Sequence, residues 1–471
     1  MKKQITTILV FLFSTCLMNQ AGYSLFAPAY GKGSVTTSER KTVTPASPAL
    51  YSPGDVGMNA RKLARIDSII MAGIKNKVFP GCQVLVMKDG KPFYDKCFGK
   101  YTYISTQKVE PNTMYDLASL SKTTGTLLAI MKLYDTGELK LTDKASQYLT
   151  FLRGTDKEKI TIKELLFHES GLPAGLPFYR LAIEKNNTPA FIATSDTMHT
   201  VMMGETKIAG SAFKYKVGWV SKIATPEFTS QVSDSFYVNN RLHSAAMEMI
   251  AHTHLQSKTY CYSCINFILL KEIAETISGT TMDVFLNREY FVPMKLSTMA
   301  YLPLRTHKKE EIAPTLKKDF LRGNEVQGFV HDPDAAFLGG VSGNAGLFAS
   351  ARDVAAVYQM ILNQGEIDGI RYLSPETCKF FTTTTSASGR RGLGYDKPIP
   401  GNHKFSPCCE LAPKAVYGHT GYTGTCCWVD PVNDLVYVFL SNRTYPYDGV
   451  NKLSKSGIRT KIQEVIYQAM K

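Results

Sequence analysis

The sequence predicts an α+β fold: an antiparallel sheet flanked by N-terminal and C-terminal helices, with a mostly helical subdomain inserted between the two parts of the sheet. Two observations lead to this prediction. Strand-like stretches follow a helical pattern near the N-terminus and precede another at the C-terminus, whereas the middle of the chain has mainly helical spacing. The 471 residues, 44% hydrophobic and 20% charged, suffice for a large core in one big domain or two smaller ones.

The first residues are typical of a secretory signal peptide. Two lysines precede the apolar run 5–18, and the small residues Ala21 and Gly22 follow it. Such a run is too short to span a membrane in the mature protein. We therefore predict a signal peptide over 1–22 and export to the periplasm or cell envelope. No other stretch of the sequence is long and apolar enough to span a bilayer.

Two further features concern the attachment of the folded part. Cys16 is a candidate lipidation site of a lipoprotein, although residues 13–15 match the small-residue consensus poorly. Residues 23–57 are rich in Ser, Thr, Pro and Gly, which predicts a flexible linker. The folded domain is predicted over 58–471, with an α/β part over 58–115 and 330–471 and a mostly helical part over 116–329.

The remaining elements are predicted from apolar spacing and from stop signals. Helices are expected at 59–75, after 116–126 up to Gly137, at 161–173 with Gly171 and Pro173 as the stop, at 266–279, at 352–365 and at 454–470. A hairpin is expected at 82–99, a glycine-rich loop at 338–348, and paired strands at 417–430 and 434–443. Residues 180–258 have no clear pattern and are interpreted as a lid or an insertion.

The ten cysteines leave two questions. Cys261 and Cys264 form a CxxC pair, but a zinc site usually needs a second such pair or histidines at fixed offsets, so no metal is predicted. The Asp89-Gly90 dipeptide predicts a two-residue hairpin turn, and pairing outward from it places Cys82 opposite Cys97. These two thiols would either form a disulfide in an oxidising envelope or face each other as buried free thiols.

A serine followed three residues later by a lysine opens a strongly apolar helical run in "DLASLSKTTGT". Residues i and i+3 share a helix face, so Lys122 would lie within reach of the Ser119 hydroxyl. Burial can lower the pKa of a lysine and make it a base for a serine nucleophile. The alternative is a surface helix with Ser119 as its cap and Lys122 in solvent. SxxK also occurs at three other places, without such a run.

Two more segments carry groups suited to the same chemistry. Tyr262 precedes an apolar helix, and a tyrosine beside an ammonium group can relay protons. His419 precedes Thr420 and Gly421 on a predicted edge strand, where glycine lets a substrate approach the backbone. The backbone N–H of the following residue, Tyr422, could form an oxyanion hole with that of Ser119. Taken singly, each segment is also common in purely structural roles.

Together, the three segments resemble the serine-active β-lactamase and penicillin-binding-protein superfamily. The closer similarity is to its class C β-lactamase-related branch, which includes DD-peptidases, D-aminopeptidases and esterases. The supporting segments are "TMYDLASLSKTTGT", "ITIKELLFHESGLP", "YSCINFILL", "GGVSGNAGLF" and "YGHTGYTGT". The resemblance spans the chain from Asn59 to the C-terminus and implies a β-lactamase/transpeptidase-like fold.

The resemblance also implies roles for particular residues: Ser119 as the acylated nucleophile, Lys122 as its proton acceptor, Tyr262 as partner base and later acid, His419 as holder of the substrate carboxylate or aid to proton transfer, and Thr420 and Gly421 along the substrate edge. Two departures stand out. Cys264, expected to touch substrate, replaces the usual Asn or Asp and is a poor hydrogen-bonding substitute. Asn344 stands where close relatives often have His.

We therefore predict an exported serine hydrolase that forms an acyl-enzyme on Ser119 and acts on D-alanyl cell-wall peptides, as a DD-carboxypeptidase does. The alternatives are an esterase or β-lactamase of the same family, an impaired enzyme that binds penicillins or muropeptides, and a structural envelope protein without a competent serine. No metal or organic cofactor is expected. The net charge of +14 is scattered, so no nucleic-acid partner is expected. We expect a monomer that contacts the membrane only if lipidated at Cys16.

Overall fold

The computed structural model describes residues 50–184, 191–192, 199–203, 207–210, 214–399, 401–402 and 405–470. The expected signal peptide, Cys16 and the linker up to residue 49 lie outside these residues. The end of the expected linker is described: Pro53–Val56 form a 3₁₀ helix, and the backbone N–H of Tyr51 donates to the carbonyl of Pro92 at 2.9 Å. Residues 50–57 are therefore attached to the sheet. Within the described residues, no helix has the length and apolar character needed to cross a bilayer.

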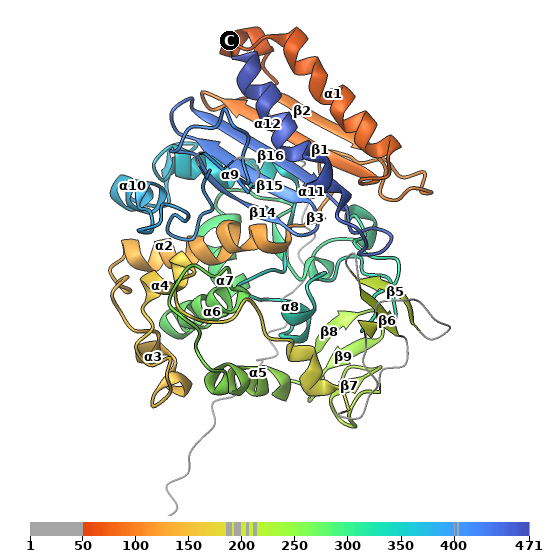
Figure 1. Ribbon diagram of the computed structural model, residues 1–471, viewed down its shortest axis with the longest axis vertical. Coiled ribbons are helices and arrows are strands. Elements are labelled where there is room, and N and C mark those ends of the chain that lie inside the picture. Colours follow the sequence, from red (N-terminus) through yellow and green to blue (C-terminus); the bar gives the residue numbers. More distant parts are fainter. Residues whose placement is uncertain are drawn as a thin grey trace, which may run out of the picture. The chain divides into compact units, whose positions relative to one another are not determined.

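A five-stranded antiparallel sheet joins the two ends of the chain (Figure 1). Its strands, in spatial order, are β14 (Tyr417–Gly421), β15 (Thr425–Asp430), β16 (Leu435–Ser441), β1 (Gly81–Lys88) and β2 (Lys91–Gly99). Helices α1 (Ala60–Lys75) and α12 (Ile458–Ala469) cover one face, and α9 (Ala351–Leu362) packs on the other. This arrangement confirms the predicted α+β class.

Neighbouring side chains of a strand point to opposite faces of the sheet, and because both sets are apolar here, helices cover both faces. Val84 and Val86 of β1 pack with α1 and α12, whereas Leu85 between them belongs to the larger core that contains α9. Helix α1 begins where predicted, because the Asn59 side chain accepts a hydrogen bond from the backbone N–H of Lys62 at 3.0 Å. The long apolar stripe of the helix then faces the sheet.

The β1–β2 hairpin turns at Asp89 and Gly90 as predicted, with φ of 53° and 70°. The expected pairing of Cys82 with Cys97 is wrong. A bulge leaves Phe93 unpaired between the pairs Met87–Pro92 and Val86–Tyr94, so Gln83 lies opposite Cys97. A shift of one residue turns a side chain to the other face of the sheet. The two thiols are accordingly free and belong to different sides.

The middle of the chain is mostly helical. The helices there are α2 (Leu127–Asp135), α3 (Ala145–Tyr148), α4 (Ile162–Phe167), α5 (Arg241–His252), α6 (Cys264–Ser278) and α7 (Met282–Leu286). Residues 180–258 also contain short strands: β4 (Phe191–Ile192), β5 (His199–Met203), β6 (Lys207–Gly210), β7 (Val220–Ser221), β8 (Ser230–Ser233) and β9 (Phe236–Val238). These form two small sheets that apolar spacing did not reveal.

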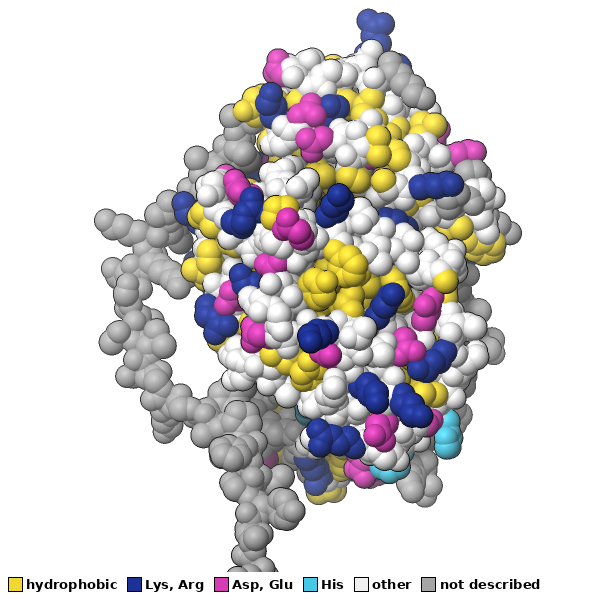
Figure 2. All heavy atoms as spheres, turned by 90° about the vertical axis from the view of Figure 1, so that its left-hand side faces the viewer, with side chains coloured by type: hydrophobic (Ala, Val, Ile, Leu, Met, Phe, Trp, Pro, Cys, Tyr) yellow, Lys and Arg dark blue, Asp and Glu magenta, His cyan; other side chains and the backbone are white. Residues whose placement is uncertain are grey.

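The other elements connect these layers. They are β3 (Tyr115–Asp116), β10 (Ala300–Tyr301), α8 (Pro333–Phe337), β11 (Leu347–Ala349), β12 (Glu366–Ile367), β13 (Ile370–Arg371), α10 (Pro375–Thr383) and α11 (Lys452–Ser456). Helix α6 ends at Gly279 as predicted, but α4 ends earlier than expected, at His168 with φ of 57°. On the face drawn in Figure 2, lysine and arginine side chains are interspersed with aspartate and glutamate.

Candidate active site

Ser119 lies in a tight turn rather than in an ordinary α-helix. It follows β3 and sits in a 3₁₀ helix, η2 (Ala118–Leu120), which leads into the π-helical segment η3 (Lys122–Thr126) and then α2. Lys122 is the first residue of the π-helical segment, and its Nζ lies 3.0 Å from the Ser119 Oγ. Lys122 is fully buried, which rules out the alternative of a lysine in solvent.

The Lys122 amine is surrounded by groups that accept hydrogen bonds or favour its positive charge. It donates to the carbonyl of Asn344 at 2.9 Å and lies 3.5 Å from the Cys264 Sγ. Burial acts to lower the pKa of Lys122, but Cys264, Tyr262 and Asp332 favour the charged amine and raise its pKa above the ordinary value. The expected lowering of this pKa is therefore wrong, because the lysine is buried against acidic partners and not against hydrocarbon alone.

Tyr262 reaches the same place from the loop before α6. The Lys122 Nζ is 5.2 Å from the centre of the Tyr262 ring, and both Lys122 and Ser119 act to lower the pKa of the tyrosine hydroxyl. Burial raises the pKa of Tyr262 more than Lys122 lowers it, so the side chain is a phenol at neutral pH. The centre of the His168 ring lies 4.7 Å from the centre of the Tyr262 ring. His168 Nδ1 accepts from the backbone N–H of Ser263 at 3.1 Å and thereby holds the tyrosine loop.

His419 faces the same space from β14. Its Nδ1 donates to the carbonyl of Thr420 at 2.7 Å, so Nε2 carries a lone pair. That Nε2 is buried and has no hydrogen-bond partner within the described part of the chain. Burial and the nearby Arg391 lower the pKa of His419 to about 3. The His419 ring is therefore neutral at pH 7, and its free Nε2 lone pair can accept a hydrogen bond.

A cavity of about 340 Å³ opens beside Ser119. Six of the eight residues expected from the sequence line it: Ser119, Tyr262, His419, Thr420, Gly421 and Tyr422. Lys122 and Cys264 are not among its lining residues, since the lysine lies behind the serine and the thiol lies against the lysine. The structure thus brings the expected residues together, with Cys264 beside Lys122 and half-buried.

Gly421 allows the end of β14 to come close to the serine turn. A Cβ built at this position would lie 2.3 Å from the carbonyl oxygen of Leu117 and 2.0 Å from the Thr425 Oγ1. Neither distance is tolerable for a carbon atom. A glycine is therefore required for the strand to run past the turn and to present Tyr422 to the cavity.

The family of the protein is decided by a match that covers most of the chain. Residues 66–455 match the family described as "Beta-lactamase". The chain belongs to the β-lactamase family. It is therefore an enzyme, a serine hydrolase, and the predicted membership and enzyme class are confirmed.

Relatives and solved structures agree with this membership. A protein of Escherichia coli O157:H7 named "Putative D-alanyl-D-alanine carboxypeptidase" is 28% identical over 427 residues, which are 84% of this chain and 85% of that protein. The structure of a class C β-lactamase has a TM-score of 0.60 at 17% identity, covering 90% of this chain and 99% of its own. D-alanine carboxypeptidase AmpC from Burkholderia cenocepacia has a TM-score of 0.56 at 17% identity, covering 87% and 99%. These structures establish the fold, a β-lactamase/transpeptidase-like one, as predicted.

Arginines that the sequence analysis missed complete the cavity of this β-lactamase-family enzyme. Arg390, Arg443 and Arg459 all line it. The Arg443 Nε donates to the carbonyl of Tyr422 at 2.7 Å, and its Nη1 lies 3.4 Å from an Asp448 oxygen. Its Nη2 is buried and has no hydrogen-bond partner within the described ranges. No local sequence pattern distinguishes Arg443, because its place depends on strands that are distant in the sequence.

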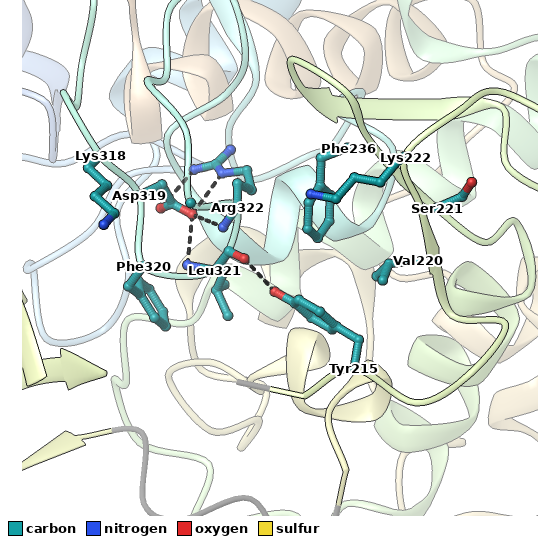
Figure 3. Close-up of a pocket in the computed structure, with 11 residues that line it drawn as sticks. Tyr215, Val220, Ser221, Lys222, Phe236, Lys318, Asp319, Phe320, Leu321 and Arg322 are labelled. Atoms are coloured by element: carbon teal, nitrogen blue, oxygen red, sulfur yellow. Dashed lines mark hydrogen bonds and ion pairs between the residues drawn. The ribbon is translucent and has the colours of Figure 1, made fainter. Parts of the chain in front are cut away.

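A second cavity, of about 320 Å³, lies between β7, β9 and residues 318–323 (Figure 3). It shares no lining residue with the cavity beside Ser119. Its wall contains the buried ion pair of Arg322 with Asp319, whose closest atoms are 3.0 Å apart. The Tyr215 hydroxyl donates to the carbonyl of Leu321 at 2.6 Å and so links residue 215 to the segment 318–323 in the cavity wall.

Proposed function

We propose that this enzyme removes the terminal D-alanine from cell-wall peptides through an acyl-enzyme on Ser119. The observation that carries the proposal is the 3.0 Å contact of the Ser119 Oγ with the buried Lys122 Nζ at the edge of a cavity shared with Tyr262 and His419. A nucleophile, a proton acceptor and a relay in contact are the parts that acyl transfer needs. The name of the 28% identical relative supports a D-alanyl peptide as substrate.

The steps follow from this geometry. The Ser119 oxygen bonds to the carbonyl carbon of the penultimate residue while its proton passes to the Lys122–Tyr262 pair, which must first have lost one proton. The backbone N–H groups of Ser119 and Tyr422 receive the oxyanion. The C–N bond then breaks, the departing D-alanine nitrogen takes the proton from Tyr262, and an ester remains on the serine. Water attacks the ester and gives its proton to the pair. The bond between the carbonyl carbon and the Ser119 oxygen then breaks, the pair returns the proton to that oxygen, and the peptide acid is released.

A D-alanyl peptide ends in a carboxylate, and the cavity contains cations to receive it. His419 is unsuited to this task because it is neutral. Arg443 has a buried Nη2 without a hydrogen-bond partner among the described residues, and a carboxylate would satisfy this N–H group. We assign the carboxylate to Arg443 and leave to His419 Nε2 the acceptance of a hydrogen bond during the reaction.

An esterase is the second candidate, favoured by Cys264. The usual Asn or Asp side chain hydrogen-bonds a substrate amide, whereas this thiol lies behind Lys122 and is not in the cavity wall. Esters have a better leaving group than amides and depend less on such a contact.

The test is covalent labelling with fluorescent penicillin and with a fluorophosphonate, followed by assays of D-alanine release, ester hydrolysis and cephalosporin turnover on the same samples. We expect labelling of the wild type, none of Ser119→Ala, and release of D-alanine. Faster ester than peptide turnover would favour the esterase. Labelling without product release would indicate an impaired binding protein, and absence of labelling would refute the proposal.

Export is part of the proposal and rests on the signal-peptide pattern over 1–22 and on the carboxypeptidase name of the relative. We expect the mature protein in the envelope fraction, as a monomer that takes a small-molecule or peptide substrate, without nucleic acid and with membrane contact only if Cys16 is lipidated. Fractionation, intact mass of the mature N-terminus and light scattering test these points. An unprocessed protein in the cytoplasmic fraction would contradict export.

A further inference from the structure

The residue before the nucleophile has a disfavoured backbone conformation. Ala118 has a φ of 48°, in the left-handed region where its Cβ is crowded by the neighbouring carbonyl. A conformation of this kind persists only if the surroundings impose it. Ser119 follows directly, so whatever holds Ala118 also sets the direction in which the Ser119 side chain leaves the backbone.

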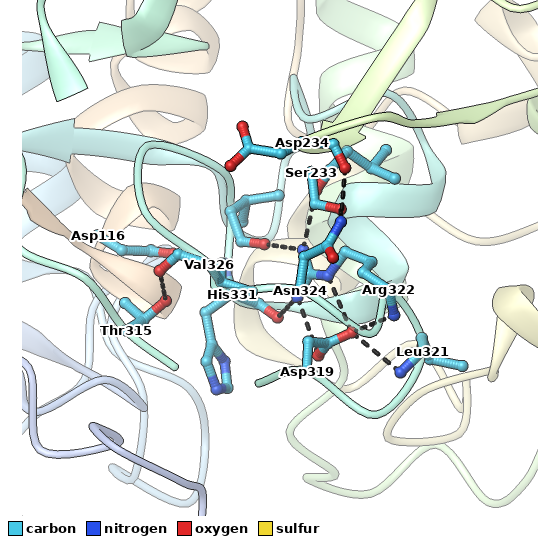
Figure 4. A network of polar contacts seen from close by, with 12 residues as sticks. Asp116, Ser233, Asp234, Thr315, Asp319, Leu321, Arg322, Asn324, Val326 and His331 are labelled. Atoms are coloured by element: carbon cyan, nitrogen blue, oxygen red, sulfur yellow. Dashed lines mark hydrogen bonds and ion pairs between the residues drawn. The ribbon is translucent and has the colours of Figure 1, made fainter. Parts of the chain in front are cut away.

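The side chain that holds Ala118 is Asp116. One carboxylate oxygen accepts from the backbone N–H of Ala118 at 2.8 Å, and the other accepts from the backbone N–H of His331 at 2.6 Å. Asp116 is 1% exposed, and Figure 4 shows it beside His331. Within the described residues, no salt bridge involves this carboxylate. Its hydrogen bonds are therefore directed at the backbone of the turn.

The His331 end of this contact is itself fixed. Arg322 donates to the carbonyls of Val330 and His331 at 2.7 and 3.2 Å, and Asp319 pairs with the same guanidinium (Figure 4). Arg322 is 3% exposed. The Arg322–Asp319 ion pair in the wall of the second cavity thus fixes the backbone at His331, to which Asp116 is hydrogen-bonded.

The backbone of the turn is held as well. The Thr423 Oγ1 donates to the carbonyl of Asp116 at 2.7 Å, and the Thr425 Oγ1 donates to that of Leu117 at 2.8 Å. These bonds fix the residues that precede Ala118, but within the described residues the only side chain that accepts a hydrogen bond from the N–H of Ala118 is Asp116. The threonines are therefore not a substitute for it.

We propose that Asp116 is a positioning residue: its carboxylate keeps Ala118 in the left-handed conformation and so places the Ser119 Oγ within hydrogen-bonding distance of the Lys122 Nζ. The inference rests on the proposed role of Ser119 as nucleophile. An asparagine at this position would keep the size of the side chain but present an NH₂ donor to one of the two backbone N–H groups, and that contact would be lost.

Protonation of the Asp116 carboxylate would weaken its hydrogen bonds to the backbone N–H groups of Ala118 and His331. Burial raises the pKa of Asp116 to about 6, and the Asp332 carboxylate adds to this, whereas the two backbone N–H groups and Arg322 act against it. The His331 side chain is neutral near that pH, because burial lowers its pKa. The wild type should therefore lose reactivity of Ser119 as the pH falls through about 6, and a variant without this carboxyl group should not have this step.

The experiment measures the rate of Ser119 labelling by a fluorophosphonate in Asp116→Asn. We expect a drop of about tenfold or more, no step near pH 6, and little change in the dissociation constant of a non-covalent peptide ligand. The matched control is Asp353→Asn, a half-buried carboxylate that accepts from the backbone N–H of Thr298 at 2.6 Å. It should lower the melting temperature but not the labelling rate.

A second substitution separates positioning from misfolding. Glycine adopts a φ near 48° without the hydrogen bond from Asp116 that holds Ala118. Adding Ala118→Gly to Asp116→Asn should therefore recover a several-fold higher labelling rate. A wild-type rate in Asp116→Asn, or no recovery in the double variant, would overturn the inference. Labelling needs no peptide substrate, so a wild type that labels but releases no D-alanine would refute only the proposed function.

Discussion

At the scale of single residues, the proton shared by Lys122 and Tyr262 decides when Ser119 can react. The pKa of each group is raised, so at neutral pH the pair holds one proton more than the active form. Raised pKa values mean that this proton leaves only as the pH increases. We predict that the labelling rate of Ser119 rises from pH 7 to pH 9 or above, measured with a fluorophosphonate. A rate that is flat or falls over this range would contradict the assignment.

Cys264 is the residue that departs most from the pattern of the family. An asparagine there would offer an oxygen to the Lys122 Nζ, now 3.5 Å from the thiol, and an NH₂ group toward the cavity. We predict that Cys264→Asn increases kcat/KM for a D-alanyl peptide relative to that for an ester by roughly tenfold, the effect of one added hydrogen bond. The same substitution at Cys261 serves as control, since Cys261 does not line the cavity.

Arg443 is predicted to recognise the end of the substrate. Arg443→Met keeps much of the side-chain volume but removes the charge and the free Nη2. We expect the KM for a peptide with a free carboxylate to increase roughly 10- to 100-fold, as for loss of a charged hydrogen bond. The KM for a neutral ester should change far less. Equal increases for both substrates would mean that Arg443 acts on the cavity as a whole.

At the scale of elements, β14 and the serine turn must approach closely, and Gly421 is the point of contact. We predict that Gly421→Ala lowers the free energy of unfolding by about 1–3 kcal/mol, the usual cost of overpacking. It should also abolish labelling, because the strand must move away from Leu117, whose carbonyl the new Cβ would meet at 2.3 Å. Denaturant unfolding and labelling check the two parts. Unchanged labelling would show that the strand position is irrelevant to Ser119.

The elements that sequence reasoning predicted well are those decided locally. Helix α1 has its cap and its apolar stripe in adjacent residues, and the Asp89-Gly90 turn needs only its own two residues. The bulge at Phe93 and the left-handed Ala118 were not predicted. The Asp116 carboxylate that holds Ala118 is itself bound to the backbone of His331, 215 positions away, which no local pattern records.

The candidate active site also has parts that the sequence predicted and parts that it did not. Ser119, Tyr262 and His419 were predicted from their motifs, and the structure brings them to one cavity. Their charge states were not predicted, since these depend on which groups surround each side chain after folding. Asp116 and Arg443 were missed for a related reason: their roles are defined by hydrogen bonds to residues more than 20 positions away or across strands.

At the scale of the whole molecule, both ends of the chain build the sheet that supports the site. Helix α12 buries Ile462, Val465 and Ile466 against it. We predict that truncation after Gly457 prevents a stable fold, because each of these side chains contributes about 1.5–3 kcal/mol through burial. Truncation after Ala469 is the control and should leave the melting temperature nearly unchanged. A cooperative transition in the shorter variant, followed by circular dichroism, would contradict this.

The pairing of β1 with β16 has a consequence for biosynthesis. A ribosome makes the first of these strands early and the second near the end, with about three quarters of the polypeptide between them. Until translation is nearly complete, the N-terminal hairpin has an open edge and cannot finish its sheet. A newly made chain is thus kept from closing this sheet before its C-terminal strands have been made.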